Sequence, residues 1–423
     1  HGSAFGINLT MATLIQGNQA TANFGSSVAI GMSVNGDEYD DLIVGALRYD
    51  NGNTDEGRTY VFNGSALGIN PLAVTTLEVN QTSANFGSSV ASIGDINNDG
   101  FLDLFIGSKC IPGKYPISSP SYVLINDKKG KFTLHQELNL GLVTDLISVD
   151  INNDSLPELA LVGEWMPITL LVNQNGKWVD KSSDYFTKEY SGWWNTIYAS
   201  DFNNDRKPDF VLGNHGLNSQ IKASMTEPVE MIVNDFDKNG SIDPVFSSYI
   251  QGKSYPFVTR DELLKQLSYL KPKFNSFSSF ADATLTTIFK ADELEKSKKL
   301  KVTHLHSCIL MSNSDKYQIK NLPLMTQVSP VYSIIGMDYN HDGFEDLVLT
   351  GNNHHYKIRI GQMDANHGIL LKNNGAGNFE YIPQRISGFK LTGDVRSVIK
   401  LKDDILLFGI NGGSVQTYQL NNQ

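Results

Sequence analysis

The sequence predicts an all-β fold, a β-propeller of seven blades, on three observations. An acidic segment of nine residues recurs six times along the 423 residues. Each copy lies between short apolar runs of strand length that are bounded by Gly, Asn and Asp. The segment Asn23–Ala29 also returns unchanged as Asn85–Ala91, at a spacing of 62 residues. Repeats of about 40 to 50 residues, each with several strands, are typical of propeller blades.

The acidic segments share one arrangement of side-chain oxygens, with Ser, Asp, Asn or Glu at positions 1, 3, 5 and 9. Calcium takes six to eight oxygen ligands, and a tight loop can add the backbone carbonyl of position 7. The expected ligands are Ser33, Asn35, Asp37, Tyr39 and Asp41; Asp95, Asn97, Asp99, Phe101 and Asp103; Asp150, Asn152, Asp154, Leu156 and Glu158; Asp201, Asn203, Asp205, Lys207 and Asp209; Asp235, Asp237, Asn239, Ser241 and Asp243; Asp338, Asn340, Asp342, Phe344 and Asp346. We therefore expect five or six bound Ca²⁺ ions.

Other interpretations of these loops are weaker. Asn, Asp and Gly are also common in plain turns, but six copies in one register favour a metal site. The strand-like flanks and the missing Glu at position 12 argue against an EF-hand. Ser33 replaces the opening Asp, so the first loop is expected to bind weakly or to stay empty. Glu38, Ser155 and Arg206 replace the Gly that stands at position 6 of the other copies, which predicts backbone strain there.

The spacing of the loops sets the expected blades within a single domain, residues 1–423. The loops begin at residues 33, 95, 150, 201, 235 and 338. The expected blades are 21–80, 81–140, 141–188, 189–225, 226–329, 330–388 and 389–423, the last without an acidic loop and closed by a strand from residues 7–15. The long fifth step is explained by a helical insertion over residues 256–302. Its first helix begins at a capping box, Thr259 to Glu262, followed by Leu263, Leu264, Leu267 and Leu270 on one helical face.

Composition narrows the classes of function. The formal net charge of -11 and the absence of a basic stripe argue against nucleic-acid binding. No run of eighteen apolar residues is present, so the sequence predicts no transmembrane segment. We expect a monomer. Cys110 and Cys308 allow at most one disulfide, and the sequence leaves open whether they pair.

A family resemblance follows from these motifs. Phe24–Gly25 and Phe86–Gly87, followed by Gly45–Ala46 and the acidic loops, resemble the FG-GAP repeats of integrin α-subunit propellers. The later copies resemble the VCBS repeats of bacterial proteins related to cartilage acidic protein, on the segments Gly163–Pro167, Gly213–Asn218, Tyr255–Phe257 and Arg260–Leu263. The change of style near residue 100 fits either divergence or the joining of two repeat types. The resemblance implies a calcium-binding adhesion module that is extracellular, periplasmic or on the cell surface, with a protein or glycan ligand.

Catalysis is the alternative function. Some calcium propellers are polysaccharide lyases, and His215, His354, His355 and Tyr356 follow strands that end at Gly213 and Gly351. We expect these histidines to pack between blades instead, because no motif of a known hydrolase or phosphate-binding site is present. Trp165, Trp193 and Trp194 offer a binding surface or, more simply, core. The sequence therefore favours a non-enzymatic binding module over an enzyme.

Overall fold

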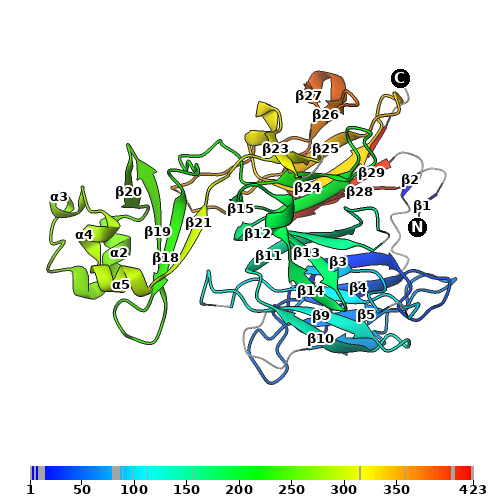
Figure 1. Cartoon of the computed structure of the whole chain (residues 1–423), viewed down its shortest axis with the longest axis horizontal. Coiled ribbons are helices and arrows are strands. Elements are labelled where there is room, and N and C mark those ends of the chain that lie inside the picture. Colours follow the sequence, from blue (N-terminus) through cyan, green and yellow to red (C-terminus); the bar gives the residue numbers. More distant parts are fainter. Residues whose placement is uncertain are drawn as a thin grey trace.

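The computed structural model describes residues 2–3, 6–7, 15–78, 86–87, 89–97, 99–111, 113–154, 156–313, 316–357, 359–401 and 405–420. This part of the chain is mostly β-strand in antiparallel sheets, which confirms the all-β class (Figure 1). A short hairpin, β1 (Gly2–Ser3) with β2 (Gly6–Ile7), precedes the sheets. The closing strand expected from residues 7–15 falls almost wholly outside the described residues.

Six sheets follow one another along the described part of the chain. Sheet 1 is β3 (Phe24–Met32), β4 (Asp41–Ala46), β5 (Arg58–Phe62) and β6 (Thr75–Leu77). Sheet 2 is β7 (Ser89–Ser92), β8 (Leu104–Gly107), β9 (Ser121–Asn126) and β10 (Phe132–Leu138). Sheet 3 is β11 (Leu142–Val149), β12 (Glu158–Pro167), β13 (Thr169–Gln174) and β14 (Lys177–Asp180), with β15 (Ser191–Trp193) paired to β12.

The remaining three sheets complete the series. Sheet 4 is β16 (Thr196–Ser200), β17 (Asp209–Gly213), β22 (Cys308–Met311) and β23 (Gln318–Asn321). Sheet 5 is β24 (Val331–Met337), β25 (Asp346–Gly351), β26 (Ile369–Asn373) and β27 (Phe379–Ile382). Sheet 6 is β28 (Asp394–Lys400), β29 (Ile405–Asn411) and β30 (Gln416–Gln419). The short helices α1 (Ser182–Tyr185) and α6 (Gln384–Ser387) and the 3₁₀ turn η2 (Leu324–Gln327) lie in connections.

The first strands of these six sheets lie side by side. β3 contacts β7, β7 contacts β11, β11 contacts β16, β16 contacts β24, and β24 contacts β28. Residues of β3 and of β29 line one and the same cavity, so the first and the last sheet border a common space. Apolar side chains fill the space between neighbouring sheets, for example Trp194 and Phe210 between sheets 3 and 4. This arrangement is consistent with a β-propeller.

The seventh sheet is not part of this series. β18 (Val229–Asn234), β19 (Asp243–Ile250), β20 (Lys253–Pro256) and β21 (Lys298–Val302) form a sheet of their own, in the order β20-β19-β18-β21. With α2 (Arg260–Gln266), η1 (Ser268–Leu270), α3 (Phe277–Phe280), α4 (Leu285–Ile288) and α5 (Ala291–Lys296), it stands apart at the left of Figure 1. We call residues 229–302 the lobe.

The lobe changes the expected order of blades. β17 pairs with β22, so residues 214–307 are inserted into the middle of sheet 4. The expected blades 189–225 and 226–329 therefore do not coincide with sheets, and six sheets, not seven, are in series. The physical reason is local pairing: β18 and β19 flank the fifth acidic loop as in a blade, but their apolar face packs on the lobe helices through Ile232, Phe236 and Val245.

The helical part of the lobe agrees with the sequence analysis. α2 begins at the predicted capping box, in which Thr259 and Glu262 each accept a hydrogen bond from the other's backbone N–H. Leu263, Leu264, Leu267 and Leu270 are all buried against the sheet, as their spacing predicts. The helical segment ends earlier than the expected residue 302, because residues 298–302 form β21 instead of continuing α5.

The packing of the first strands depends on glycine near the end of each second strand. A Cβ on Gly351 would lie 1.7 Å from the backbone oxygen of Pro330, and one on Gly213 would lie 2.6 Å from that of Val331. We expect Gly351→Ala to lower the free energy of unfolding by about 1–3 kcal/mol, because backbone cannot move aside without disturbing the sheet. Urea denaturation measures this. Gly413→Ala is the control, because its Cβ would meet only side-chain atoms of Ile410; equal losses would contradict the packing argument.

Candidate functional site: acidic loops and a central cavity

All six acidic loops have the same hydrogen bond at their base. The carboxylate at position 9 opens a buried strand and is at most 4 % exposed in every copy. It accepts the backbone N–H of position 2 over 2.7 to 3.2 Å in every loop. These carboxylates are Asp41, Asp103, Glu158, Asp209, Asp243 and Asp346. The shared contact closes each loop at the same register.

The second oxygen of the position 9 carboxylate extends the contact to another part of the fold. In sheets 1, 2, 4 and 5 it accepts a backbone N–H, from Gly64, Asn126, Ser312 and Asn373. In the lobe it accepts from the side chain of Gln266 on α2, at 3.3 Å. Five of the six carboxylates thus join their loop to another segment, which in sheet 4 follows the insertion, whereas the second oxygen of Glu158 accepts from Asn152 of its own loop at 2.9 Å.

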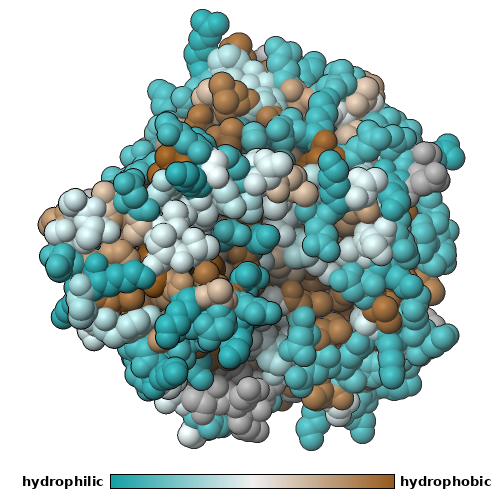
Figure 2. Space-filling view, turned by 60° about the vertical axis from the view of Figure 1, so that its left-hand side comes forward, coloured by the Kyte–Doolittle hydropathy of each residue, from teal (hydrophilic) through white to brown (hydrophobic). Residues whose placement is uncertain are grey.

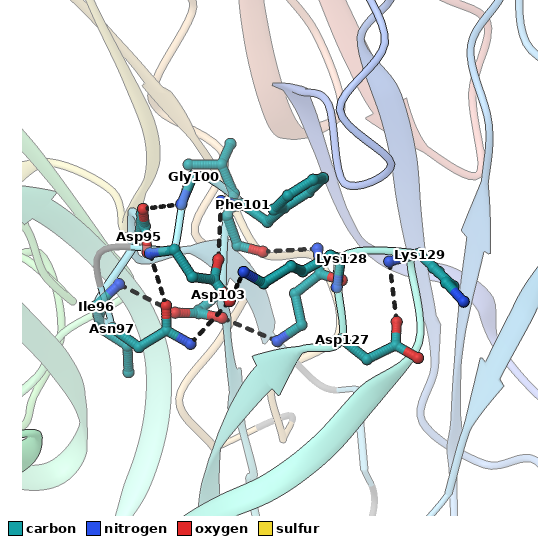
Figure 3. A network of polar contacts seen from close by, with 12 residues as sticks. Asp95, Ile96, Asn97, Gly100, Phe101, Asp103, Asp127, Lys128 and Lys129 are labelled. Atoms are coloured by element: carbon teal, nitrogen blue, oxygen red, sulfur yellow. Dashed lines mark hydrogen bonds and ion pairs between the residues drawn. The ribbon is translucent and has the colours of Figure 1, made fainter.

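The upper part of each loop directs oxygens inward. Figure 3 shows the second loop, where Asp99 N–H donates to Asp95 and Asn97, and Gly100 N–H donates to Asp95. The N–H of position 7 donates to the oxygen at position 5 in all six loops, at 2.8 to 3.1 Å. Ligation by the position 7 carbonyls stays a prediction. The repeated pattern shows that position 5 is held by its own loop in every copy.

These oxygens suit a hard divalent cation. Among the described residues, Asp235, Asp237 and Asp243 form a group whose carboxylate oxygens lie within 4.8 Å of one another. Burial raises the pKa of Glu158 to about 7 and that of Asp209 and of Asp346 to about 6. A bound cation favours the ionised carboxylate and so opposes the rise in pKa that burial causes. Oxygen donors only, in an irregular cluster, fit calcium better than zinc or magnesium.

Neighbouring hairpins contact the loops from the next sheet. The side-chain amide of Asn126 donates to the carbonyl of Val34 in loop 1, and that of Asn373 donates to Phe202 in loop 4. Lys128 and Lys372 come from the same two hairpins, but their ammonium groups lie 3.8 and 3.1 Å from Asp99 and Asp342, in the acidic loops of their own sheets. The loops are therefore parts of the contacts between sheets.

The strain predicted at position 6 is present in one of the three substituted loops. Arg206 has φ 67°, like the glycines in the second, fifth and sixth loops, whereas Glu38 has no positive φ and Ser155 lies outside the described residues. In the first loop Ser33 donates to Asn35 at 3.1 Å, where other loops have a carboxylate. The first loop therefore differs in conformation as well as in charge.

Arg206→Gly is expected to stabilise the protein by about 0.5 kcal/mol. Removing the strain of a non-glycine residue in the left-handed region adds about 1–2 kcal/mol to the free energy of unfolding. The greater conformational freedom of glycine in the unfolded chain offsets part of this gain. The midpoint of urea denaturation measures the change. Arg206→Ala keeps the strain, so equal stabilisation by both substitutions would point to the removed charge instead.

A second feature, a cavity of about 1700 Å³, lies among the six sheets. Each sheet contributes the residue that stands two positions after the glycine near the end of its second strand. These residues are Leu47, Lys109, Trp165, His215, Asn353 and Asn411. The acidic loops precede the same strands, so loops and cavity residues lie at opposite ends of each strand, roughly 17–20 Å apart for five or six residues. The spacing after this glycine is the signal that the sequence analysis did not use.

Three of the four candidate catalytic residues line this cavity: His215, His355 and Tyr356. His215 Nδ1 lies 3.1 Å from the Tyr356 hydroxyl, and its Nε2 lies 3.2 Å from Ser219 Oγ. Burial lowers the pKa of His215 to about 4, so the ring is neutral at pH 7. His354 instead forms a close contact with Asp394. His215 is 2 % exposed and packs between Trp193 and Tyr356, as expected for a histidine between blades, and it also lines the cavity.

Of the three tryptophans singled out in the sequence as a binding surface or core, Trp165 and Trp193 also line the cavity. Trp165 and Trp193 meet edge to face with ring centroids 5.3 Å apart, whereas Trp194 is fully buried in the core. Trp165 Nε1–H donates to the Tyr115 hydroxyl, which donates to Glu164 at 3.0 Å. Lys109 pairs with the other oxygen of Glu164 at 2.9 Å. The sequence analysis missed Lys109, Tyr115 and Glu164.

Cys110 and Cys308 do not form a disulfide, and Cys308 is buried. In the described part of the chain, no helix has the length and apolar character needed to cross a bilayer.

Comparisons with known proteins support the repeat assignment. Residues 24–62 match the family model of the FG-GAP repeat, and residues 150–212 match that of the FG-GAP-like repeat. These segments contain the first, third and fourth acidic loops. The resemblance of later copies to VCBS repeats stays a prediction.

Similar proteins match over part of the chain. Integrin alpha-3 of Mus musculus is 38% identical over 104 residues, which cover 24% of this chain and 10% of that protein. Phosphatidylinositol-glycan-specific phospholipase D of Bos taurus is 32% identical over 150 residues, or 32% and 18% of the two chains. Integrin alpha-8 of Gallus gallus is 26% identical over 226 residues, or 51% and 17%. The chain spans less than a fifth of the length of these relatives. It carries FG-GAP repeats and is similar over part of its length to integrin alpha subunits.

Proposed function

We propose that this protein is a calcium-stabilised β-propeller that binds a protein or glycan ligand outside the cell, on the cell surface or in the periplasm. The single observation that carries the proposal is the hydrogen-bond pattern shared by six acidic loops. A plain turn needs no buried carboxylate at its base, yet each loop has one at position 9 and further oxygens at positions 1, 3 and 5. Six sheets form the propeller in this proposal, and the lobe is an addition to sheet 4.

Several features support a role in binding outside the cytosol. Calcium sites of modest affinity fill at millimolar extracellular calcium and stay empty at cytosolic levels. Integrin alpha-3 and the phospholipase D are similar over part of the chain. On the face shown in Figure 2, hydrophilic residues predominate and the hydrophobic patches are separate.

Native mass spectrometry tests the metal part of the proposal. We expect five or six calcium ions per chain, of which five fill loops 2 to 6. Asp99→Ala should remove one ion from that count, because Asp99 lies at position 5 of the second loop. Asp292→Ala, an exposed carboxylate on α5, is the matched control and should remove none. A protein that carries no calcium at millimolar concentration would overturn the proposal.

A second candidate, a polysaccharide lyase, is favoured by one observation. The neutral His215 and the Tyr356 hydroxyl lie within hydrogen-bond distance in the cavity, and a neutral imidazole can accept a proton from a sugar ring carbon. Incubation with uronic-acid polysaccharides, followed by the ultraviolet absorbance of unsaturated products, tests it. Absorbance that rises with the unaltered protein and not with His215→Ala would support the lyase; the absence of any rise would exclude it for those substrates.

A further inference from the structure

The size of the central cavity indicates an extended ligand. Its volume of about 1700 Å³ exceeds the roughly 300–1,000 Å³ of common small-molecule pockets. Its lining comes from all six sheets in series and from the lobe, which contributes Phe257 and Glu262 near the start of α2. A ligand here would contact every sheet, so the cavity can hold several sugar-sized units.

Aromatic rings form one wall of the cavity. Trp165 has φ 60°, a conformation that a bulky residue adopts only under strain. Trp165 lies at a β-bulge in β12, where the pairing of β12 with β15 changes register between Glu164 and Met166. The bulge places the Trp165 ring against Trp193 and Phe246 beside the cavity. Strain of this kind is concentrated at functional sites.

Trp193 is the accessible member of this wall. Unlike Trp165, which is 6 % exposed, Trp193 is half-buried. It stacks on Phe246 and meets His215 edge to face at 5.1 Å. A half-buried indole held on both sides presents a rigid apolar plane, on which the C–H face of a sugar ring can lie.

The charges that line the cavity are largely compensated within the protein. Lys109 pairs with Glu164, and Arg359 forms a close ion pair with Glu262 of the lobe. Arg396 lies 3.4 Å from Asp394 and stacks on Tyr332 at 3.8 Å. Lys357 is exposed, where solvent and salt screen its charge. The lining therefore offers no strong positive site for a carboxylate or phosphate.

Neutral hydrogen-bonding groups occupy the other side of the cavity. Asn353 donates to the Tyr332 hydroxyl at 3.1 Å, and Asn411 comes from sheet 6, the next sheet in the series. The Tyr356 hydroxyl follows Asn353 along the chain, and the uncharged His215 ring comes from sheet 4. Amides, hydroxyls and a neutral imidazole can both donate and accept, as sugar hydroxyls do.

We infer that the central cavity binds a neutral oligosaccharide, with Trp193 as the stacking plane and the Lys109–Glu164 pair as a hydrogen-bonding group for its hydroxyls. The inference rests on the proposed function of a binding module and names the ligand class and the place. Glu164 keeps the site neutral, because it compensates Lys109. The acidic loops, at the far ends of the strands, stabilise the sheets and do not touch this ligand.

Isothermal titration calorimetry with the calcium-loaded full chain tests the inference. The probes are hexasaccharides of β-linked glucose, mannose and xylose, with a galacturonate hexamer as the acidic comparison. We expect one or more neutral hexasaccharides to bind and the galacturonate to bind at least tenfold more weakly. Trp193→Ala should weaken the neutral ligand about tenfold or more. Trp178→Phe is the matched control, because Trp178 is buried in the core of sheets 2 and 3.

Glu164→Gln provides a readout that a structural role would not change. It keeps the shape of the side chain but leaves Lys109 without its carboxylate partner, so the preference should shift toward the galacturonate hexamer. The inference is overturned if no neutral hexasaccharide binds, if the unaltered protein prefers galacturonate, or if Trp193→Ala binds as the unaltered protein does. Thermal unfolding with and without calcium in the same preparations shows separately whether the proposed calcium-stabilised module holds and whether each variant is folded.

Discussion

Addition of 1 mM calcium to chelator-treated protein is expected to raise the free energy of unfolding by about 2–7 kcal/mol. An ion that binds only the folded state stabilises it by mass action, and dissociation constants of about 10⁻⁴–10⁻³ M give about 0.4–1.4 kcal/mol for each site. Loops 2 to 6 supply five such sites. Differential scanning calorimetry in calcium and in excess chelator measures the shift.

The controls separate calcium from ionic strength and from other cations. The same concentration of magnesium should give a smaller shift, because magnesium demands a regular octahedron and fewer protein ligands. Sodium chloride at matched ionic strength should shift the transition little. Identical unfolding in calcium and chelator would remove the metal from the proposed function.

Asp209→Ala is expected to lower the free energy of unfolding by about 2–5 kcal/mol in chelator, and by more in calcium, where a ligand of loop 4 is lost as well. The two carboxylate oxygens of Asp209 accept the backbone N–H groups of Phe202 and Ser312 at 3.0 and 2.6 Å. A buried N–H without an acceptor costs about 1–3 kcal/mol, and two would be left. Phe202 precedes β17 and Ser312 follows β22, so the substitution also loosens sheet 4 where the insertion enters it.

Asp209→Asn distinguishes the hydrogen bonds from the charge. The amide keeps one acceptor oxygen, so its loss in chelator should be about half that of Asp209→Ala. The exposed Asp292→Ala should change the unfolding free energy by less than about 0.5 kcal/mol. An Asp209→Ala protein as stable as the unaltered one in urea denaturation would contradict the role given to this carboxylate.

The sequence was most informative where one short segment determines its own structure. The acidic loops and the capping box at Thr259 lie where their patterns predict. These elements depend on contacts within a few residues. Their side chains and turns therefore carry most of the information that forms them.

The position of the lobe could not be predicted in this way. The fifth loop has the same register as the others, and β18 and β19 alternate like the strands of a blade. What separates them from the series is that β17 pairs with β22, a partner roughly 100 residues further on. A local pattern does not encode such a pairing, which depends on the helices covering one face of the lobe sheet.

The cavity residues were missed for another reason. Lys109, Trp165, His215 and Asn353 share a position after a glycine but no chemistry, so they do not appear as a repeat. At Gly45 and Gly213 the glycine is required by the close approach of backbone from the next sheet, which is visible only once neighbouring sheets are in place. The repeat thus sets where a ligand-contacting residue stands and leaves its identity free to vary.

The insertion into sheet 4 also has a consequence for the order of folding. Pairing of β17 with β22 must close a loop of roughly 100 residues, and closure entropy grows with the length of the free segment. The antiparallel pair of β18 and β21 brings Val229 opposite Val302. Once this pair has formed, the loop that remains to be closed consists only of the segments between β17 and β18 and between β21 and β22. If the lobe folds first, sheet 4 forms faster. A substitution that destabilises the lobe would then slow the refolding of the six sheets, although it changes no contact among them.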